Sequence, residues 1–182
     1  MSYGPFEKWG IDAIGPLPTT RGGKEYIVME TDYMTRWVEG IATKRVTAQV
    51  VASFIFDNIC SRFGTPLEII SDRGPSFRAD LVGEHMKKLK NKRQHSSRYY
   101  PQCNGLMEKI NGVFCKIITK QVGKHPHTWD QHLNAALWAY RTSLHTSLGF
   151  TPFHLVYGQE AILPIEVELE PLKSAISSQN RS

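Results

Sequence analysis

Three carboxylates in this sequence lie in distinctive local surroundings. Asp12 lies within WGIDAIGPLP, Asp72 within IISDRGPSF and Glu108 within YYPQCNGLMEKIN, and thirty-five residues separate the last two acids. Two aspartates carried by strands and one glutamate carried by a helix can converge to hold a pair of divalent metal ions. Paired ions of this kind stabilise the attacking and the leaving oxygen of a phosphoryl transfer. The three acids therefore predict metal-dependent chemistry at phosphate esters.

The donor atoms also indicate the metal. Magnesium prefers hard oxygen ligands and retains several waters, so we expect two Mg²⁺ or Mn²⁺ ions per active site, bound by Asp12, Asp72 and Glu108. Three neighbouring carboxylates repel one another without cations, so the site should depend on metal. Each acid alone also has an ordinary explanation. Asp12 suits a strand end, Asp72 suits a turn, and Glu108 suits a solvated helix that pairs it with a lysine.

Positive charge is concentrated in one segment of the 182-residue chain, whose formal net charge is +5. Residues 85–129 contain ten lysines and arginines but a single acid, Glu108. Such a field favours a polyanionic partner, because neutralising phosphates supplies affinity that does not depend on sequence. The alternative is a basic helix and loop that are simply solvated. The lone acid within the field favours a metal ligand beside phosphates.

The elements that must position these acids follow from apolar periodicity. β-Favouring runs predict strands at residues 9–14, 26–31, 37–41 and 67–70, and the turn material at 16–23 predicts a hairpin between the first two. Thr47 is a candidate N-cap for a helix that Gly64 ends. Strand, helix and strand in succession predict an α/β arrangement with at least one parallel pair. The last of these strands delivers Asp72 at its end.

Further helices are expected at residues 81–89, 105–122 and 128–143, with a basic loop at 91–104 and Asn104 as an N-cap. In the helix 105–122, the inward stripe consists of Met107, Ile110, Phe114, Ile117 and Ile118. At about 100° per residue, Glu108 lies away from that stripe, on a face with Asn111, Gly112 and Cys115. A neighbouring line at i, i+7 and i+11 consists of Lys109, Lys116 and Lys120. This is the arrangement that a metal ligand next to DNA requires.

The local sequences around the three acids, and the spacing from Asp72 to Glu108, resemble the catalytic core of retroviral-type integrases, specifically those of plant gypsy-type LTR retrotransposons. The resemblance covers about residues 9–167. It implies an α/β, ribonuclease H-like fold with a mixed five-stranded sheet flanked by helices. It also implies an Asp-Asp-Glu polynucleotidyl transferase/endonuclease that performs DNA integration through 3′-end processing and strand transfer, and a nuclear location.

The resemblance extends to individual residues and to partners. Gln102 and Asn104, in YYPQCNG, match loop residues that approach DNA ends, and Asn111 matches an asparagine that orients the site. The implied partners are element-end DNA, target DNA and further copies of the chain in a homodimer or higher oligomer. Related sequences carry basic residues four and seven positions after the glutamate, where this chain has Gly112 and Cys115. DNA contacts are therefore expected from Lys109, Lys116 and Lys120.

Composition predicts one globular domain. We expect a lead-in at residues 1–8, the core at 9–167 and a polar, disordered tail at 168–182, with no run of about 20 apolar residues that would span a membrane. The three cysteines form no CxxC pair and suggest free thiols. Because the histidines show no zinc-site spacing, the chain resembles an isolated core or fragment. Two alternatives stay open: a catalytically silent nucleic-acid-binding or oligomerisation module, and a host-type nuclease of the same fold.

Overall fold

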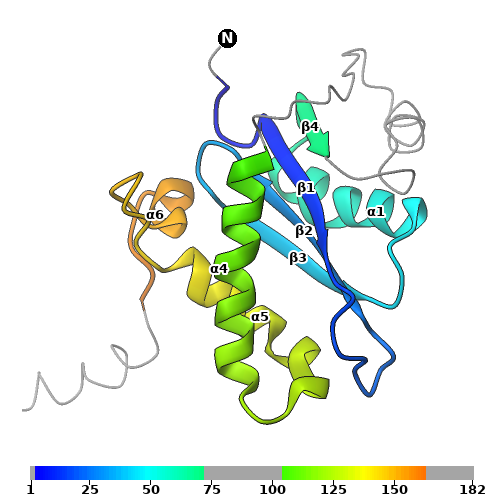
Figure 1. The fold of residues 1–182 in the computed structure, drawn as a ribbon. Coiled ribbons are helices and arrows are strands. Elements are labelled where there is room, and N and C mark those ends of the chain that lie inside the picture. Colours follow the sequence, from blue (N-terminus) through cyan, green and yellow to red (C-terminus); the bar gives the residue numbers. More distant parts are fainter. Residues whose placement is uncertain (1–2, 72–103, 163–182) are drawn as a thin grey trace, which may run out of the picture.

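The computed structural model describes residues 3–71 and 104–162, and its centre is a mixed β-sheet (Figure 1). The strands lie in the order β3-β2-β1-β4. Their bounds are β1 Lys8–Ile14, β2 Tyr26–Asp32, β3 Val38–Thr43 and β4 Glu68–Ser71. β1 and β2 form the expected antiparallel hairpin, and β2 pairs with β3 in the same sense. Within the described residues there are four strands, so the expected count of five is wrong for this part of the chain.

The predicted parallel pair joins β1 to β4. Its register sets Lys8 opposite Glu68 and, three residues later, Ile11 opposite Ser71. The Nζ of Lys8 lies 3.3 Å from an Oε of Glu68, so an ion pair fixes the first rung of this ladder. Parallel strands need a crossover connection, which the helical segment between β3 and β4 provides.

That helical segment begins and ends as predicted. Helix α1 (Ala48–Phe54) starts after Thr47, whose Oγ1 accepts a hydrogen bond from the backbone N–H of Val50. The backbone continues through a π-helix, η1 (Ile55–Cys60), and the short helix α2 (Ser61–Phe63) to Gly64, which has a φ of 84°. Glycine adopts this positive φ without the steric cost that a Cβ would add. The π-helical turn was not predicted from the sequence.

Helices cover both faces of the sheet (Figure 1). On one face, α4 (Asn104–Val122) and α5 (Trp129–Arg141), between which the 3₁₀ turn η4 (Pro126–Thr128) lies, pack on Ile27, Met29 and Val38. On the other face, α1 and η1 pack on Ile11 and Val28. The alternation along β2 follows from the two-residue period of a strand, which sends successive side chains to opposite faces. Side chains that α4 can reach must therefore lie on the first of these faces.

The predicted helix stripes are confirmed almost in full. Of the five apolar residues expected to face inward from α4, four are buried and Ile117 is half-buried. All of the expected apolar positions of α5 are buried, namely Trp129, Leu133, Ala136, Leu137 and Tyr140. The turn between β1 and β2 is fastened to the start of α5. Trp129 donates its indole N–H to the Pro18 carbonyl, and Lys24 pairs with Asp130.

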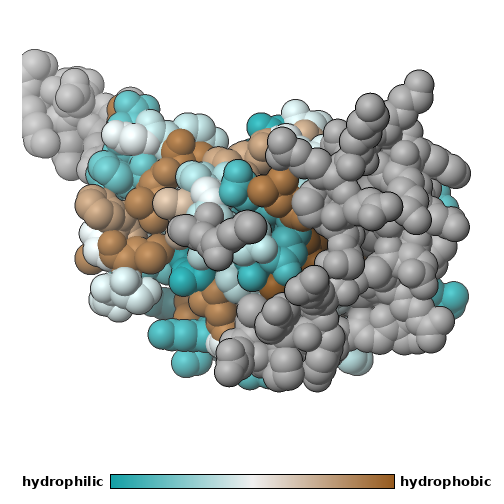
Figure 2. All heavy atoms as spheres, turned by 90° about the horizontal axis from the view of Figure 1, so that it is seen from above, coloured by the Kyte–Doolittle hydropathy of each residue, from teal (hydrophilic) through white to brown (hydrophobic). Residues whose placement is uncertain are grey.

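After α5 the chain packs a short helix, α6 (Pro152–Tyr157), against the edge of the domain. The Phe153 ring lies 6.4 Å from Trp37 and 5.7 Å from Trp138, measured between ring centroids. Seen from above, apolar residues gather on the side where α6 lies (Figure 2), and Tyr157 there is exposed. No helix in the described ranges has the length and apolarity to cross a membrane.

Candidate active site on β1 and α4

Asp12 lies inside β1, two residues before the strand ends, and its side chain is directed toward α4. The residue is buried, with 6% of its surface exposed. One carboxylate oxygen accepts a hydrogen bond from the Ala13 backbone N–H at 2.7 Å. The other accepts from Nδ2 of Asn111 at 2.5 Å. The strand thus holds the carboxylate in one orientation, although the acid is not at the strand end that the sequence suggested.

Close packing at Gly10 sets the position of α4 on β1. A Cβ at this position would lie 2.7 Å from Sδ of Met107 and 2.9 Å from Cε2 of Tyr33. Two residues along a strand advance roughly 7 Å, and four residues along a helix advance about 6 Å. The pairs Gly10–Met107 and Asp12–Asn111 therefore match in spacing. The small residue in WGID sets the helix at the height where Asn111 meets Asp12.

Glu108 lies directly after Met107 and one helical turn before Asn111, and it is exposed as predicted. The position of Glu108 on the sheet follows from two contacts of α4 that flank it in the sequence. Met107 packs on Gly10, and Asn111 binds Asp12. Positions three apart are neighbours on a helix surface, so Glu108 and Asn111 share one side of α4. An exposed carboxylate thus lies one helical turn from the residue that binds the buried Asp12.

The other predicted site residues fall at or beyond the limits of the described chain. Asp72 and Gln102 lie outside it, and Asn104 is described only as the first residue of α4. The parallel ladder sets Ile11 opposite Ser71, and in the sequence these two residues directly precede the two aspartates. In the ranges 3–71 and 104–162 no group of three His, Cys, Asp or Glu side chains could hold a metal ion. These ranges contain Asp12 and Glu108 but not Asp72.

The oxygen atoms around Asp12 suit a hard cation. Oδ1 of Asn111 is buried and has no hydrogen-bond partner within the described part of the chain, while Nδ2 of the same amide is bound to Asp12. A buried carbonyl oxygen without a partner is costly, and a metal-bound water could supply the missing donor. Carboxylate and amide oxygens are ligands that magnesium accepts. The residues present therefore fit the expected metal.

The predicted basic line on α4 is exposed over its whole length, at Lys109, Lys116 and Lys120. Gly112, on the side that carries Glu108, is also exposed, and a Cβ there would meet no atom within 4 Å. Cys60 and Cys115 are free, as predicted, while Cys103 lies outside the described residues. Burial raises the pKa of both thiols, that of Cys60 to about 11. These two cysteines are therefore poor nucleophiles near neutral pH.

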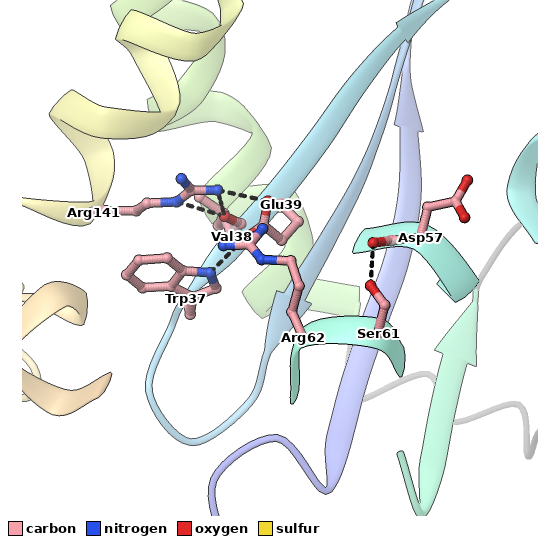
Figure 3. A network of polar contacts seen from close by, with 7 residues as sticks. All are labelled: Trp37, Val38, Glu39, Asp57, Ser61, Arg62 and Arg141. Carbon is pink, nitrogen blue, oxygen red and sulfur yellow. Dashed lines mark hydrogen bonds and ion pairs between the residues drawn. The ribbon is translucent and has the colours of Figure 1, made fainter. Parts of the chain in front are cut away.

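A polar network at the edge of the sheet was not predicted from the sequence (Figure 3). The buried Glu39 carboxylate accepts from Arg62 at 2.6 Å and from the Trp37 indole N–H at 2.8 Å. Its other oxygen lies 2.8 Å from Nη2 of Arg141, which also binds the Val38 carbonyl. Arg141 stacks on Trp37, 4.5 Å from the ring centroid. Arg62 and Arg141 are both distant from Glu39 in the sequence, so no local pattern predicted their contacts.

A second buried acid, Glu30, lies directly opposite Glu39 in the β2–β3 register. It is fully buried, and neither carboxylate oxygen has a hydrogen-bond partner within the described residues. Burial raises the pKa of Glu30 well above its ordinary value, and the negative charge of Glu39 raises it further. Burial thus favours the protonated, neutral form of Glu30, which lies on the face of the sheet opposite Asp12. It contributes to the core rather than to the candidate site.

Comparison with known proteins places this geometry in context. The family model described as "Integrase core domain" matches residues 2–101. The Gag-Pol polyprotein of Avian reticuloendotheliosis virus is 32% identical over 154 residues, covering 85% of this chain and 13% of the relative. The Pol polyprotein from transposon 412 of Drosophila melanogaster is 26% identical over 159 residues, covering 87% and 13%. The chain thus spans about 13% of the length of these relatives.

Solved structures share the fold. The HTLV-2 integrase catalytic core domain in complex with magnesium superposes in its trimeric form with a TM-score of 0.65 at 24% identity, covering 83% of this chain and 96% of that one. Its dimeric form gives 0.65 at 22% identity, covering 84% and 97%. The likeness confirms the ribonuclease H-like α/β fold expected from the sequence.

Proposed function

Because this chain belongs to the family of integrase core domains, we propose that it performs 3′-end processing and strand transfer on DNA as the catalytic core of a retrotransposon integrase. The family is one of polynucleotidyl transferases, and the retroviral and retrotransposon relatives agree with an integrase-type role. The observation that supports the proposal most strongly is the bond between Asp12 and Asn111, because the exposed Glu108 lies one turn before Asn111 on the same side of α4.

Asp12, Asp72 and Glu108 are the residues that would hold the metal, as two Mg²⁺ or Mn²⁺ ions. When bound, the ions would activate a water or a DNA 3′-hydroxyl and stabilise the leaving 3′-oxygen. The chain itself keeps Asp12 in place through the Ala13 N–H and the Asn111 amide. Magnesium is present in the related HTLV-2 core, which supports the choice of metal.

Element-end and target DNA are the proposed partners. The exposed Lys109, Lys116 and Lys120 would neutralise phosphates along α4, and Gln102, Asn104 and Asn111 would contact DNA near the catalytic acids. We further propose a homodimer or higher oligomer acting in the nucleus. The HTLV-2 core occurs in dimeric and trimeric forms, which supports self-association.

Disintegration of a branched DNA substrate tests the proposal. This reaction reverses strand joining and requires only the chemistry of the catalytic core. The assay would compare the native chain, Glu108→Gln and the control Asp57→Asn, whose side chain is exposed on η1. We expect native and control chains to release joined strands in Mg²⁺ or Mn²⁺, and Glu108→Gln to release none. A folded native chain that binds DNA without any metal-dependent cleavage or joining would support the silent-module alternative.

A further inference from the structure

A hollow of about 220 Å³ lies beside α4, bounded by the end of α5 and the loop that follows it. It is smaller than the roughly 300–1,000 Å³ of a pocket that encloses a whole small molecule. A site of this size suits one part of an extended partner. The residues that matter for its chemistry are Arg36, Lys109, Val113, Tyr140, Leu144 and His145.

Two cations and no acid are among the described residues that line the hollow, the cations being Arg36 and Lys109. His145 lies close enough to Arg36 and Lys109 for their charges to change its pKa. Burial lowers the pKa of His145; a hydrogen bond with the Tyr140 backbone opposes this, and the charges of Arg36 and Lys109 lower the pKa further. The two cations thus share one small space, which would favour an anion entering between them.

Tyr140 supplies a hydrogen-bond donor without a partner. Only 2% of the residue is exposed, and its hydroxyl has no hydrogen-bond partner within residues 3–71 and 104–162. Burial raises the pKa of Tyr140, so the hydroxyl keeps its proton. Its ring packs edge-on against His145 with centroids 4.7 Å apart, which holds it in the wall of the hollow. A bound acceptor oxygen would satisfy this donor.

Apolar side chains that are open to solvent also line the hollow. Val113 is 43% exposed and Leu144 is 64% exposed, although both are large hydrophobic side chains. An occupant should therefore combine an anionic group with an apolar surface. A nucleotide has both, because its phosphate carries the charge while its base and sugar offer faces for apolar contact.

We propose that this hollow holds one nucleotide of the DNA strand, with its phosphate near Arg36 and Lys109 and its base or sugar against Val113 and Leu144. The inference rests on the proposed function, which makes DNA the substrate. At about 100° per residue, the line of Lys109, Lys116 and Lys120 lies between Glu108 and the side of α4 that borders the hollow. A strand that reaches Glu108 from the hollow would cross these lysines.

The test measures binding of a fluorescent DNA duplex by anisotropy at several salt concentrations, using the full chain. Arg36 has a φ of 61°, so Arg36→Asn removes the charge while keeping a residue that tolerates this backbone. Tyr140→Phe removes only the hydroxyl. Arg45→Gln, on an exposed loop, is the matched control for loss of one positive charge.

We expect Arg36→Asn to weaken binding about tenfold and to reduce the slope of log affinity against log salt by about 0.9, since one phosphate contact is lost. Tyr140→Phe should weaken binding about fivefold with the slope unchanged, since a neutral hydrogen bond releases no counterion. Arg45→Gln should match the native chain. Leu144→Asp, at a position that is 64% exposed, places a negative charge at the rim without disturbing the core and should weaken binding more than tenfold.

Native-like affinity and salt slope in Arg36→Asn, Tyr140→Phe and Leu144→Asp would overturn the inference, provided that the native chain binds DNA and disintegrates the branched substrate. If the native chain itself neither binds DNA nor disintegrates the branched substrate, the proposed function is contradicted instead. The inference would also be overturned if Tyr140→Phe weakened the binding of an acidic peptide as much as the binding of DNA, because the hollow would then be a general anion site.

Discussion

Asn111 on α4 donates a hydrogen bond from Nδ2 to Oδ2 of Asp12 on β1 at 2.5 Å, across ninety-nine positions of sequence. Helix and strand are thereby joined at the residue on which the proposed metal site depends. Residues that orient a ligand typically change metal affinity or activity by about 10–100-fold when they are removed.

Asn111→Ala should therefore raise the Mg²⁺ concentration needed for half-maximal disintegration by about 10–100-fold, because Asp12 loses the donor that orients it. The chain should stay folded by circular dichroism. Asn134→Ala, an exposed asparagine on α5, is the control and should behave as the native chain. An unchanged metal requirement in Asn111→Ala would show that the bond does not serve the site.

Gly10→Ala should destabilise the domain by about 1–3 kcal/mol, the usual cost of overpacking. The added Cβ would lie 2.7 Å from the Met107 sulfur and 2.9 Å from Cε2 of Tyr33, so these packed side chains must shift. Gly112→Ala meets open space in the same helix and should instead stabilise the domain by up to about 1 kcal/mol. Urea unfolding of the two variants checks these opposite signs, and a shared sign would contradict the packing described for β1 and α4.

Glu30 should make stability depend on pH. Its pKa is raised in the folded chain, so the folded state keeps a proton that the unfolded state releases above about pH 4.5. Its contribution to stability is therefore complete below that pH and is lost as the pH rises toward the folded pKa. Glu30→Gln stays neutral, so it should gain stability relative to the native chain between pH 5 and pH 8, by at most about 1.4 kcal/mol per pH unit. Urea unfolding at several pH values measures this difference, and a constant difference would refute the buried neutral acid.

The two arginines that bind Glu39 should differ in how much they contribute to the stability of the folded domain. Arg141 is 15% exposed at its side chain and also binds the Val38 carbonyl, whereas Arg62 is 41% exposed. Arg141→Met should cost about 3–5 kcal/mol, because it leaves a buried carboxylate with less compensation. Arg62→Met should cost no more than about 1 kcal/mol, as for partly exposed pairs. Thermal or urea unfolding would rank the two, and the reverse order would contradict the network geometry.

Local patterns predicted what depends on local interactions. Apolar, β-favouring runs located the four strands, helical apolar spacing located α4 and α5, and Thr47 and Gly64 marked the ends of a helix. The exposed position of Glu108 also followed from its place on the helix. These features are set by residues close to each other in the chain.

Contacts between distant segments could not be predicted in this way. The contact of Gly10 with Met107 could not be predicted from the local sequence, nor could the ion pairs of Glu39 with Arg62 and Arg141. Packing of separate elements creates these contacts. Asn111 was singled out only through a family resemblance. The hollow beside α4 likewise forms only when Arg36 comes to lie near the end of α5.

We propose that Asp12 holds a catalytic metal, and metal-specific rescue of Asp12→Cys tests this directly. A thiolate is a poor ligand for Mg²⁺, whereas the softer ion Mn²⁺ accepts a sulfur ligand more readily. The measurement is the rate of disintegration of branched DNA in each metal. We predict that the native chain is active in both, and that Asp12→Cys is inactive in Mg²⁺ and partly active in Mn²⁺. Full activity of Asp12→Cys in Mg²⁺, or native activity without any divalent metal, would contradict the claim.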